Sequence, residues 1–332
     1  MKQEEKLLRL LEEHHSLGIA EQIDYQKFYL YSLITHSTAI EGSTVTEVEN
    51  QLLFDEGITA KGRTLQEQMM NLDLKAAYEQ SMRLARLHTD FSVEMLKSLS
   101  ALVMKNTGAS YNTAQGSFDA SKGDLRLVGV TAGTGGRSYM NYQKVPGKLA
   151  EFCEQLNRNR HQLMGSEDMI AKYLLSFDAH YQLVTIHPWV DGNGRMSRLV
   201  MNQLQYEFGL VPVKIIKEDK AEYIQALIDS REQESLAPFR AFMIEEHIRN
   251  ISKEIEEYKK TQEGTDDKLT SADDKPTIIL AYLKEKGQCK TSELSELLGL
   301  KPTQTKAYLY KLLQEGKIVA HGANKNRTYS LA

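Results

Sequence analysis

Twelve residues, HPWVDGNGRMSR at 187–198, hold side chains that together could handle a phosphate group. The Gly-Asn-Gly run at 192–194 comes just before residues with helical spacing. A helix N-terminus offers unpaired N–H groups and a partial positive charge to an anion, and glycines let the anion approach closely. Arg195 and Arg198 are three residues apart, so they share a helix face and both can reach the same anion. The stretch therefore predicts a phosphate site.

Two other side chains in this stretch could add chemistry to the phosphate site. Asp191 is placed to hold a cation that also contacts phosphate oxygens, most readily Mg²⁺. His187 could act as a general base near neutral pH. A calcium loop is disfavoured, because Arg195 and Asn202 stand at its fifth and twelfth positions, where acceptor side chains are needed. The combination points to phosphoryl or nucleotidyl transfer.

The same twelve residues resemble the signature of Fic-domain proteins, His-x-Phe-x-Asp/Glu-Gly-Asn-Gly-Arg-x-x-Arg. Trp189 stands where phenylalanine is usual, a departure that concerns local packing more than chemistry. The resemblance covers most of residues 30–230. It implies a mainly α-helical fold and a nucleotidyltransferase that moves AMP from ATP to a Ser, Thr or Tyr hydroxyl of a protein target, or of the chain itself. It assigns the base to His187, Mg²⁺ to Asp191, and the ATP phosphates to Gly192, Asn193, Gly194, Arg195 and Arg198.

An inhibitory element of the same family is similar to STAIEG at 37–42. The resemblance implies an N-terminal inhibitory segment at about 35–43, in which Glu41 pairs with Arg198 and displaces the outer phosphates of ATP. Taken alone, the residues also suit an ordinary helix end with Gly42 as its cap.

The stretch GDLRLVGVTAGTGGRSYMNY at 123–142 interrupts the helical pattern. Its two strand-like runs around a Gly- and Thr-rich turn predict a β-hairpin. Taken alone, these residues predict a surface hairpin with no functional role. The family resemblance implies that it is the flap, which holds the target segment by strand addition.

Residues 1–261 are predicted to form one helical domain, because apolar residues recur there at spacings of three and four. Capping boxes predict helix starts at Thr46 with Glu49 and at Thr64 with Glu67. Long helices are expected over 64–87, 92–104, 166–183, 193–208 and 235–260.

The polar stretch at 262–275 is predicted to be a linker, and residues 276–332 resemble a small winged helix-turn-helix domain. This tail carries nine Lys and Arg against four Glu, a charge of +5, whereas the rest of the chain carries −9. A DNA partner and a protein partner both remain open for it. The turn is expected at Gly299, and the side chains available to a partner are Thr303, Gln304, Lys306, Tyr308, Lys311, Lys325 and Arg327.

The composition bears on the class of protein and on its cellular compartment. No apolar run is long enough to span a bilayer, so a membrane partner is not expected. The two cysteines, Cys153 and Cys289, do not form a disulfide framework or a zinc site, and a cytoplasmic protein is expected. Three alternatives stay open: a DNA-binding regulator whose Fic-like domain senses nucleotide or binds a partner, an enzyme that removes AMP, and a homodimer.

Overall fold

The structure is a computed structural model that describes residues 3–132, 136–266, 274–298, 300, 302–314, 316–322 and 327–332. The chain divides into two compact units, Met1–Ile255 and Glu256–Ala332. The fold is mainly helical, which confirms the predicted fold class. Among the described residues, no helix combines the length and apolar character needed to cross a membrane.

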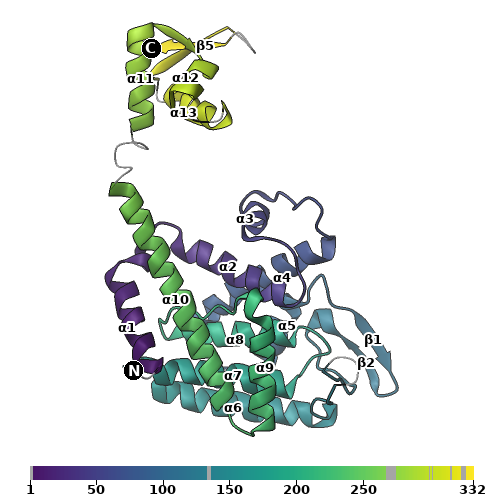
Figure 1. Cartoon of the computed structure of the whole chain (residues 1–332). Coiled ribbons are helices and arrows are strands. Elements are labelled where there is room, and N and C mark those ends of the chain that lie inside the picture. The colour runs from purple at the N-terminus through teal and green to yellow at the C-terminus, as the bar shows by residue number, and fades with distance from the viewer. Residues whose placement is uncertain are drawn as a thin grey trace. The chain divides into compact units, whose positions relative to one another are not determined.

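The first unit is a bundle of helices with one projecting hairpin (Figure 1). Its α-helices are α1 (Gln3–Ser16), α2 (Tyr25–Ile40), α3 (Glu47–Glu56), α4 (Leu65–Arg86), α5 (Val93–Val103), α6 (Val145–Leu163), α7 (Met169–Ile186), α8 (Asn193–Glu207), α9 (Lys220–Glu232) and α10 (Ala237–Asp266). Short 3₁₀ turns are η1 (Ile19–Glu21), η2 (Ala120–Lys122), η3 (Tyr142–Lys144) and η4 (Lys217–Asp219), and the strands are β1 (Ser110–Thr113) and β2 (Gly116–Asp119).

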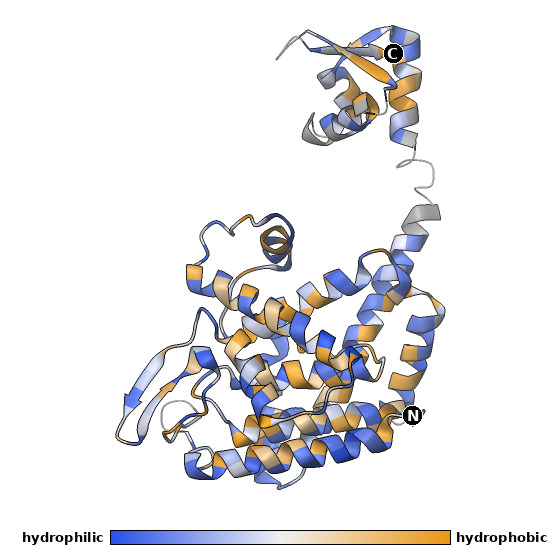
Figure 2. Cartoon of the chain, turned by 180° about the vertical axis from the view of Figure 1, so that it is seen from behind, coloured by the Kyte–Doolittle hydropathy of each residue, from blue (hydrophilic) through white to orange (hydrophobic). Residues whose placement is uncertain are grey.

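Helix α8 lies at the centre of this unit and packs against both α4 and α7. Four of its apolar side chains are completely buried, namely Met196, Leu199, Val200 and Leu204. Polar bonds also fix its position, since the Tyr78 hydroxyl on α4 donates to Asn202 at 2.6 Å. In Figure 2 the helices show apolar and polar residues in alternation along their length, as amphipathic helices do. The burial of α8 places the start of this helix rigidly.

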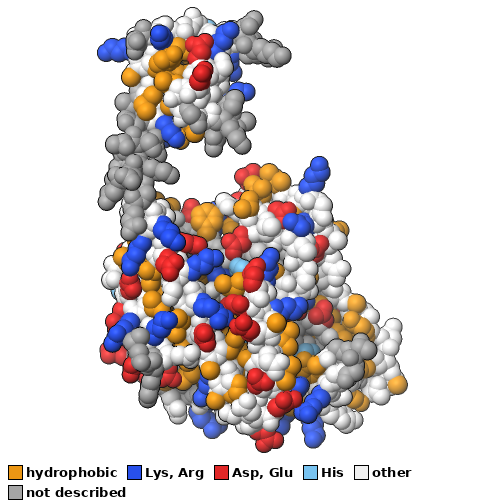
Figure 3. All heavy atoms as spheres, viewed as in Figure 1, with side chains coloured by type: hydrophobic (Ala, Val, Ile, Leu, Met, Phe, Trp, Pro, Cys, Tyr) orange, Lys and Arg blue, Asp and Glu red, His pale blue; other side chains and the backbone are white. Residues whose placement is uncertain are grey.

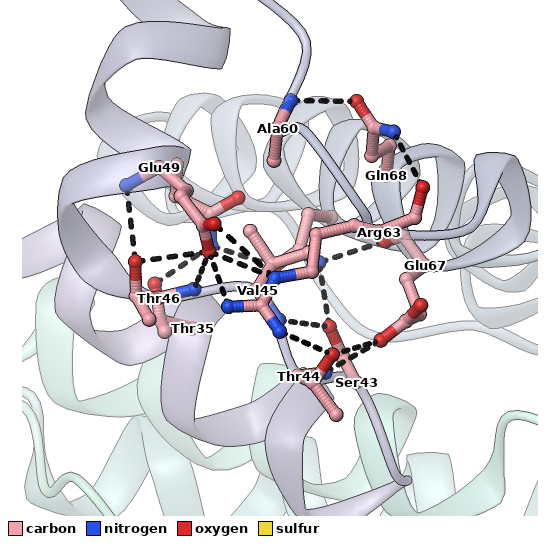
Figure 4. A network of polar contacts seen from close by, with 12 residues as sticks. Thr35, Ser43, Thr44, Val45, Thr46, Glu49, Ala60, Arg63, Glu67 and Gln68 are labelled. Carbon is pink, nitrogen blue, oxygen red and sulfur yellow. Dashed lines mark hydrogen bonds and ion pairs between the residues drawn. The ribbon is translucent and has the colours of Figure 1, made fainter.

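Both predicted capping boxes are present. Thr46 caps α3 with Glu49, and Thr64 caps α4 with Glu67. Figure 4 shows that the same carboxylates tie down the segment between α2 and α3: Glu67 accepts from the backbone N–H of Thr44 at 2.7 Å. Apolar side chains reach the surface over α3 in Figure 3, where Val48 is 68% exposed.

Of the predicted hairpin at 123–142, the described residues form a short antiparallel contact and no regular strand. The two-stranded sheet is instead β1–β2 at 110–119, where Tyr111 pairs with Phe118 and their rings stack. Within 123–142 a single bridge joins Thr131 to Ser138. Two backbone bonds accompany the bridge, from the N–H of Ala132 to the Arg137 carbonyl at 3.1 Å and from the N–H of Tyr139 to the Val130 carbonyl at 2.9 Å. Side-chain bonds, described below, also join the two legs. Residues 133–135, at the predicted turn, lie outside the described residues.

The predicted linker at 262–275 begins too early. Helix α10 continues to Asp266, because its polar sequence is compatible with a helix. Ion pairs such as that of Lys260 with Glu256 at 3.8 Å support its exposed turns. The linker residues 267–273 lie outside the described part of the chain, and the next helix begins at Asp274.

The second unit contains α11 (Asp274–Lys286), β3 (Gln288–Lys290), α12 (Thr291–Leu298), α13 (Pro302–Gln314), β4 (Ile318–His321) and β5 (Thr328–Leu331). The strands form one antiparallel sheet in the order β3-β5-β4. Its core includes Leu283, Cys289 and Leu312. Tyr308, predicted to be available to a partner, packs against this core, whereas Tyr310 is 63% exposed. Gly299, Lys325 and the side chains of Thr303 and Gln304 lie outside what the structure describes.

Candidate active site

His187 is the residue that ends helix α7. It adopts a left-handed backbone conformation with φ 51°, which turns the chain sharply toward α8. Its Nδ1 lies 3.2 Å from the carbonyl oxygen of Val184. A carbonyl can only accept, so we assign the proton to Nδ1, which leaves Nε2 with a free lone pair.

The surroundings of His187 keep its ring neutral. Burial lowers the pKa of His187 to about 4, and the nearby charge of Arg126 acts in the same direction. The Tyr139 ring stacks on the imidazole with 3.7 Å between ring centroids. At neutral pH this histidine can accept a proton.

The start of helix α8 has no room for side chains at its two glycines. A Cβ at Gly192, which has φ +80°, would lie 2.8 Å from the Met104 sulfur. A Cβ at Gly194 would lie 2.5 Å from an oxygen of Glu41. The N–H of Gly192 donates to the Asp191 carboxylate at 2.6 Å. The positive φ favours glycine at 192, and a side chain at 194 would displace the Glu41 carboxylate. The first-turn N–H groups that follow have no acceptor inside the helix.

Asn193 holds the loop together from inside. Its side chain accepts from the Trp189 N–H at 3.1 Å and donates to the Trp189 carbonyl at 2.9 Å. Trp189 is 1% exposed, and its indole N–H donates to the carbonyl of Gly123. The side chain of Asn193 is therefore occupied, and it can offer only its backbone N–H to an anion.

Arg198 is buried and lies against the end of helix α2. Its guanidinium donates to the Glu41 carboxylate at 2.6 Å, to the Ser37 hydroxyl at 2.8 Å and to the Ser37 carbonyl at 3.0 Å. The hydroxyl of Tyr223 lies 2.9 Å from Nε2 of His180. Burial acts to lower the pKa of Arg198, but Glu41 and Tyr223 together outweigh it and raise that pKa.

Glu41 follows the last residue of α2, and its side chain is 34% exposed. Burial acts to raise the pKa of Glu41, but the charge and hydrogen bond of Arg198 prevail and lower it. The carboxylate is thus ionised at neutral pH. The sequence placed Glu41 and Arg198 157 residues apart, and the fold brings them into direct contact.

Arg195 is less well satisfied than Arg198. It is 3% exposed, and its guanidinium reaches the Val103 carbonyl at 3.4 Å and the Met104 sulfur at 3.1 Å. Asp191, whose side chain is 64% exposed, lies 3.7 Å away. The Nε of Arg195 has no hydrogen-bond partner among the described residues. Arg195 is a buried cation with unused donor capacity beside the helix start.

A cavity of about 910 Å³ is lined by Tyr139, whose ring stacks on the His187 imidazole. Tyr139 and Met140 form one wall, and helix α9 contributes Ile224, Leu227 and Ile228 to the other. A volume near the upper end of the range for small-molecule sites, with mostly apolar walls, suits a planar ring system.

Comparison with known proteins locates this site in a known fold. Residues 90–205 match the Fic/DOC family model. A Fic domain-containing signaling protein from Bacteroides thetaiotaomicron superposes with a TM-score of 0.63 at 19% identity, over 76% of this chain and 98% of that one. The helical unit has the Fic fold. This confirms the fold implied by the resemblance at 187–198.

Named relatives of the Fic unit carry an activity in their names. Protein adenylyltransferase fic-1 of Caenorhabditis elegans is 25% identical over 79% of this chain and 47% of its own length. Protein adenylyltransferase Fic of Drosophila melanogaster is 27% identical over 69% of this chain and 42% of its own length. The chain thus spans less than half the length of these relatives. Residues 276–325 match a FaeA-like protein model.

Sequence reasoning missed several residues of the candidate site. Tyr139, Tyr223 and Arg126 come from three separate stretches, and no short motif marks them. Ser37 stood inside the quoted STAIEG run, but its bonds to Arg198 were not anticipated. A buried arginine without a neighbouring carboxylate has no local pattern in a sequence, since its acceptors are backbone carbonyls.

Proposed function

We propose that the chain transfers AMP from ATP to a hydroxyl group of a protein. The observation that carries this proposal is a neutral imidazole, His187, with a free Nε2 beside a helix start that holds two buried arginines. The names of the relatives supply the nucleotide and the acceptor class. Incubation of the purified protein with labelled ATP and a cell extract tests it, and the expected result is labelled protein bands.

The geometry supports the following roles in this proposal. His187 Nε2 takes the proton of the target hydroxyl while that oxygen attacks the α-phosphorus of ATP. The bond to the β-phosphate breaks, and pyrophosphate leaves. The backbone at Gly192, Asn193 and Gly194 holds phosphate oxygens. Arg195 and Arg198 hold the outer phosphates, and the unpartnered Nε of Arg195 supports a ligand there.

Asp191 suits a Mg²⁺ ion that arrives with the nucleotide. Mg²⁺ in nucleotide sites takes one or two carboxylates and fills its other positions with phosphate oxygens and water. The exposed carboxylate of Asp191 fits this pattern, and the described residues hold no cluster of three metal-binding side chains. Such an ion would neutralise charge on the phosphates.

Glu41 would keep this enzyme inactive. Its carboxylate occupies the Arg198 guanidinium at 2.6 Å and lies against Gly194, so it adds negative charge where the outer phosphates must bind. The apolar cavity beside Tyr139 would hold the adenosine.

The pH dependence of transfer should reflect the lowered pKa of His187. With a pKa of about 4, the ring is neutral throughout pH 5–7, so kcat/KM of an active variant should stay flat across this range. An unperturbed histidine would lose about tenfold by pH 5.5. Tyr139→Ala exposes the ring and should move the acid limb toward pH 6.5. The measurement is AMP incorporation from pH 5 to 8, with circular dichroism to exclude unfolding. A fall of about fivefold between pH 6.5 and 5.5 in the active variant contradicts it.

A second candidate function, binding of duplex DNA, concerns the second unit. Lys290, Lys306, Lys311 and Arg327 are exposed there, and Tyr310 lies one turn from Lys306 on α13. We expect the full-length protein to bind duplex DNA weakly, with affinity that falls steeply as salt rises.

Charge reversal tests this DNA contact. Lys306→Glu combined with Lys311→Glu should reduce affinity at least tenfold in fluorescence anisotropy at low salt. The matched control reverses two exposed lysines of the helical unit, Lys6 and Lys122. If neither pair alters binding, or if no binding occurs at low salt, the unit serves a protein partner instead.

A further inference from the structure

Arg126 is a buried arginine between the flap segment 123–142 and the loop that carries His187. It is 1% exposed. Its Nε donates to the His187 carbonyl at 2.7 Å, and its Nη1 to the Val128 carbonyl at 2.7 Å. Its Nη2 donates to the Met140 carbonyl at 2.5 Å. The backbone N–H of Arg126 donates to the Pro188 carbonyl at 3.1 Å.

The guanidinium is held by carbonyls only. Among the described residues Arg126 has no carboxylate within ion-pair distance, and burial lowers the pKa of its guanidinium. A buried charge without a counter-ion is costly, so the carbonyl dipoles must offset much of that cost. Because burial of this unpaired guanidinium costs free energy, its presence here indicates that the directions of its N–H groups have a structural role.

The three acceptors belong to separate parts of the chain. Val128 and Met140 stand on the two legs of the flap, just outside the short antiparallel contact that joins the legs, which has Thr131–Ser138 as its one bridge in the described residues. His187 belongs to the catalytic loop. A guanidinium is planar and rigid, so its N–H directions fix three carbonyls in one plane.

We propose that Arg126 is a positioning residue that fastens both legs of the flap to the catalytic loop and so sets where a target segment lies relative to His187. The part of this inference that concerns a target segment rests on the proposed function. The part that concerns the contact between the flap and the loop does not. Lysine carries the same charge but lacks the planar fork, so it can replace one of the three bonds at a time.

The fastening is tested by hydrogen exchange of the full-length protein without ligand. In Arg126→Lys and Arg126→Gln, the amides of Ala132 and Tyr139, which bond across the flap, should exchange at least tenfold faster than in the parent. Amides of α4 should be unchanged. The matched control is Arg160→Lys, because Arg160 is equally buried but bonds to Thr89, Asp90 and Glu207, away from the flap.

The effect of Arg126 on activity is measured in protein that also carries Glu41→Gly. Arg126→Lys should lower kcat/KM for protein transfer by about tenfold to a hundredfold, the cost of misplacing a reactant by about 1 Å. KM for the protein target should rise more than KM for ATP, and Arg160→Lys should show no such split.

Unchanged flap exchange in Arg126→Lys overturns the proposal, and so does full activity with lysine. If Glu41→Gly itself labels nothing, the proposed function fails while faster flap exchange still supports the fastening.

Discussion

Glu41→Gly should raise AMP incorporation at least tenfold over the parent protein. The substitution frees Arg198, which Glu41 engages at 2.6 Å, and removes negative charge from the place where outer phosphates must bind. Because Glu41 is 34% exposed, water screens the pair, yet a coupling of about 1.4 kcal/mol already changes the ratio of competent to blocked protein tenfold. The measurement is incorporation of labelled AMP into the protein itself and into extract proteins.

Controls separate this effect from a general loosening of the fold. Glu56→Gly removes an exposed glutamate from the end of α3 and should leave incorporation at the level of the parent. Glu41→Gln keeps the shape but not the charge, so it should release part of the inhibition. Equal incorporation by the parent and Glu41→Gly, with a competent target present, would exclude Glu41 as the inhibitor.

His187→Ala in the Glu41→Gly background should abolish most of the transfer, by roughly a hundredfold to ten-thousandfold, the range for a general base. Binding of ATP should stay within about threefold, because His187 stands beside the phosphate cradle and outside it. Incorporation of AMP checks the expected loss of transfer, and equilibrium binding of ATP, measured on the same preparations, checks the expected retention of nucleotide binding.

The left-handed backbone at His187 requires matched variants, because alanine is strained at φ 51°. Asparagine tolerates this conformation, so His187→Asn should be equally inactive but more stable than the alanine variant. His88→Ala is the control, since His88 also follows a helix end with φ 49°. Transfer by His187→Asn at the parent's rate would remove the imidazole from the mechanism.

Much of the site could be predicted from residues 187–198 because its parts are close in the chain. A helix start, two arginines on one helix face and a histidine just before them follow from spacing alone. The pairing of Glu41 with Arg198 came only from the family resemblance, since the contact spans most of the helical unit. Local rules also placed the caps at Thr46 and Thr64 correctly, because a capping box needs only four residues.

The flap shows where sequence reasoning failed. Its Gly- and Thr-rich turn looked like a hairpin, but strand pairing at 110–119 was missed, and the legs at Val128 and Met140 are joined through the side chain of Arg126. No periodicity can reveal a bond from a buried guanidinium to a distant carbonyl. The start of the linker was predicted too early, because a loss of apolar residues was taken as the end of the helix. The polar residues after Lys260 remain helical, because helix propensity does not require apolar residues.

Trp189 gives the protein an optical reporter of its own. It is the only tryptophan in the chain, and it is buried between the Asn193 side chain and the Gly123 carbonyl at the base of the flap. All indole emission therefore arises from one point beside the start of α8. If the proposed function holds, nucleotide binding should change this emission in the unlabelled protein, before any target has been identified.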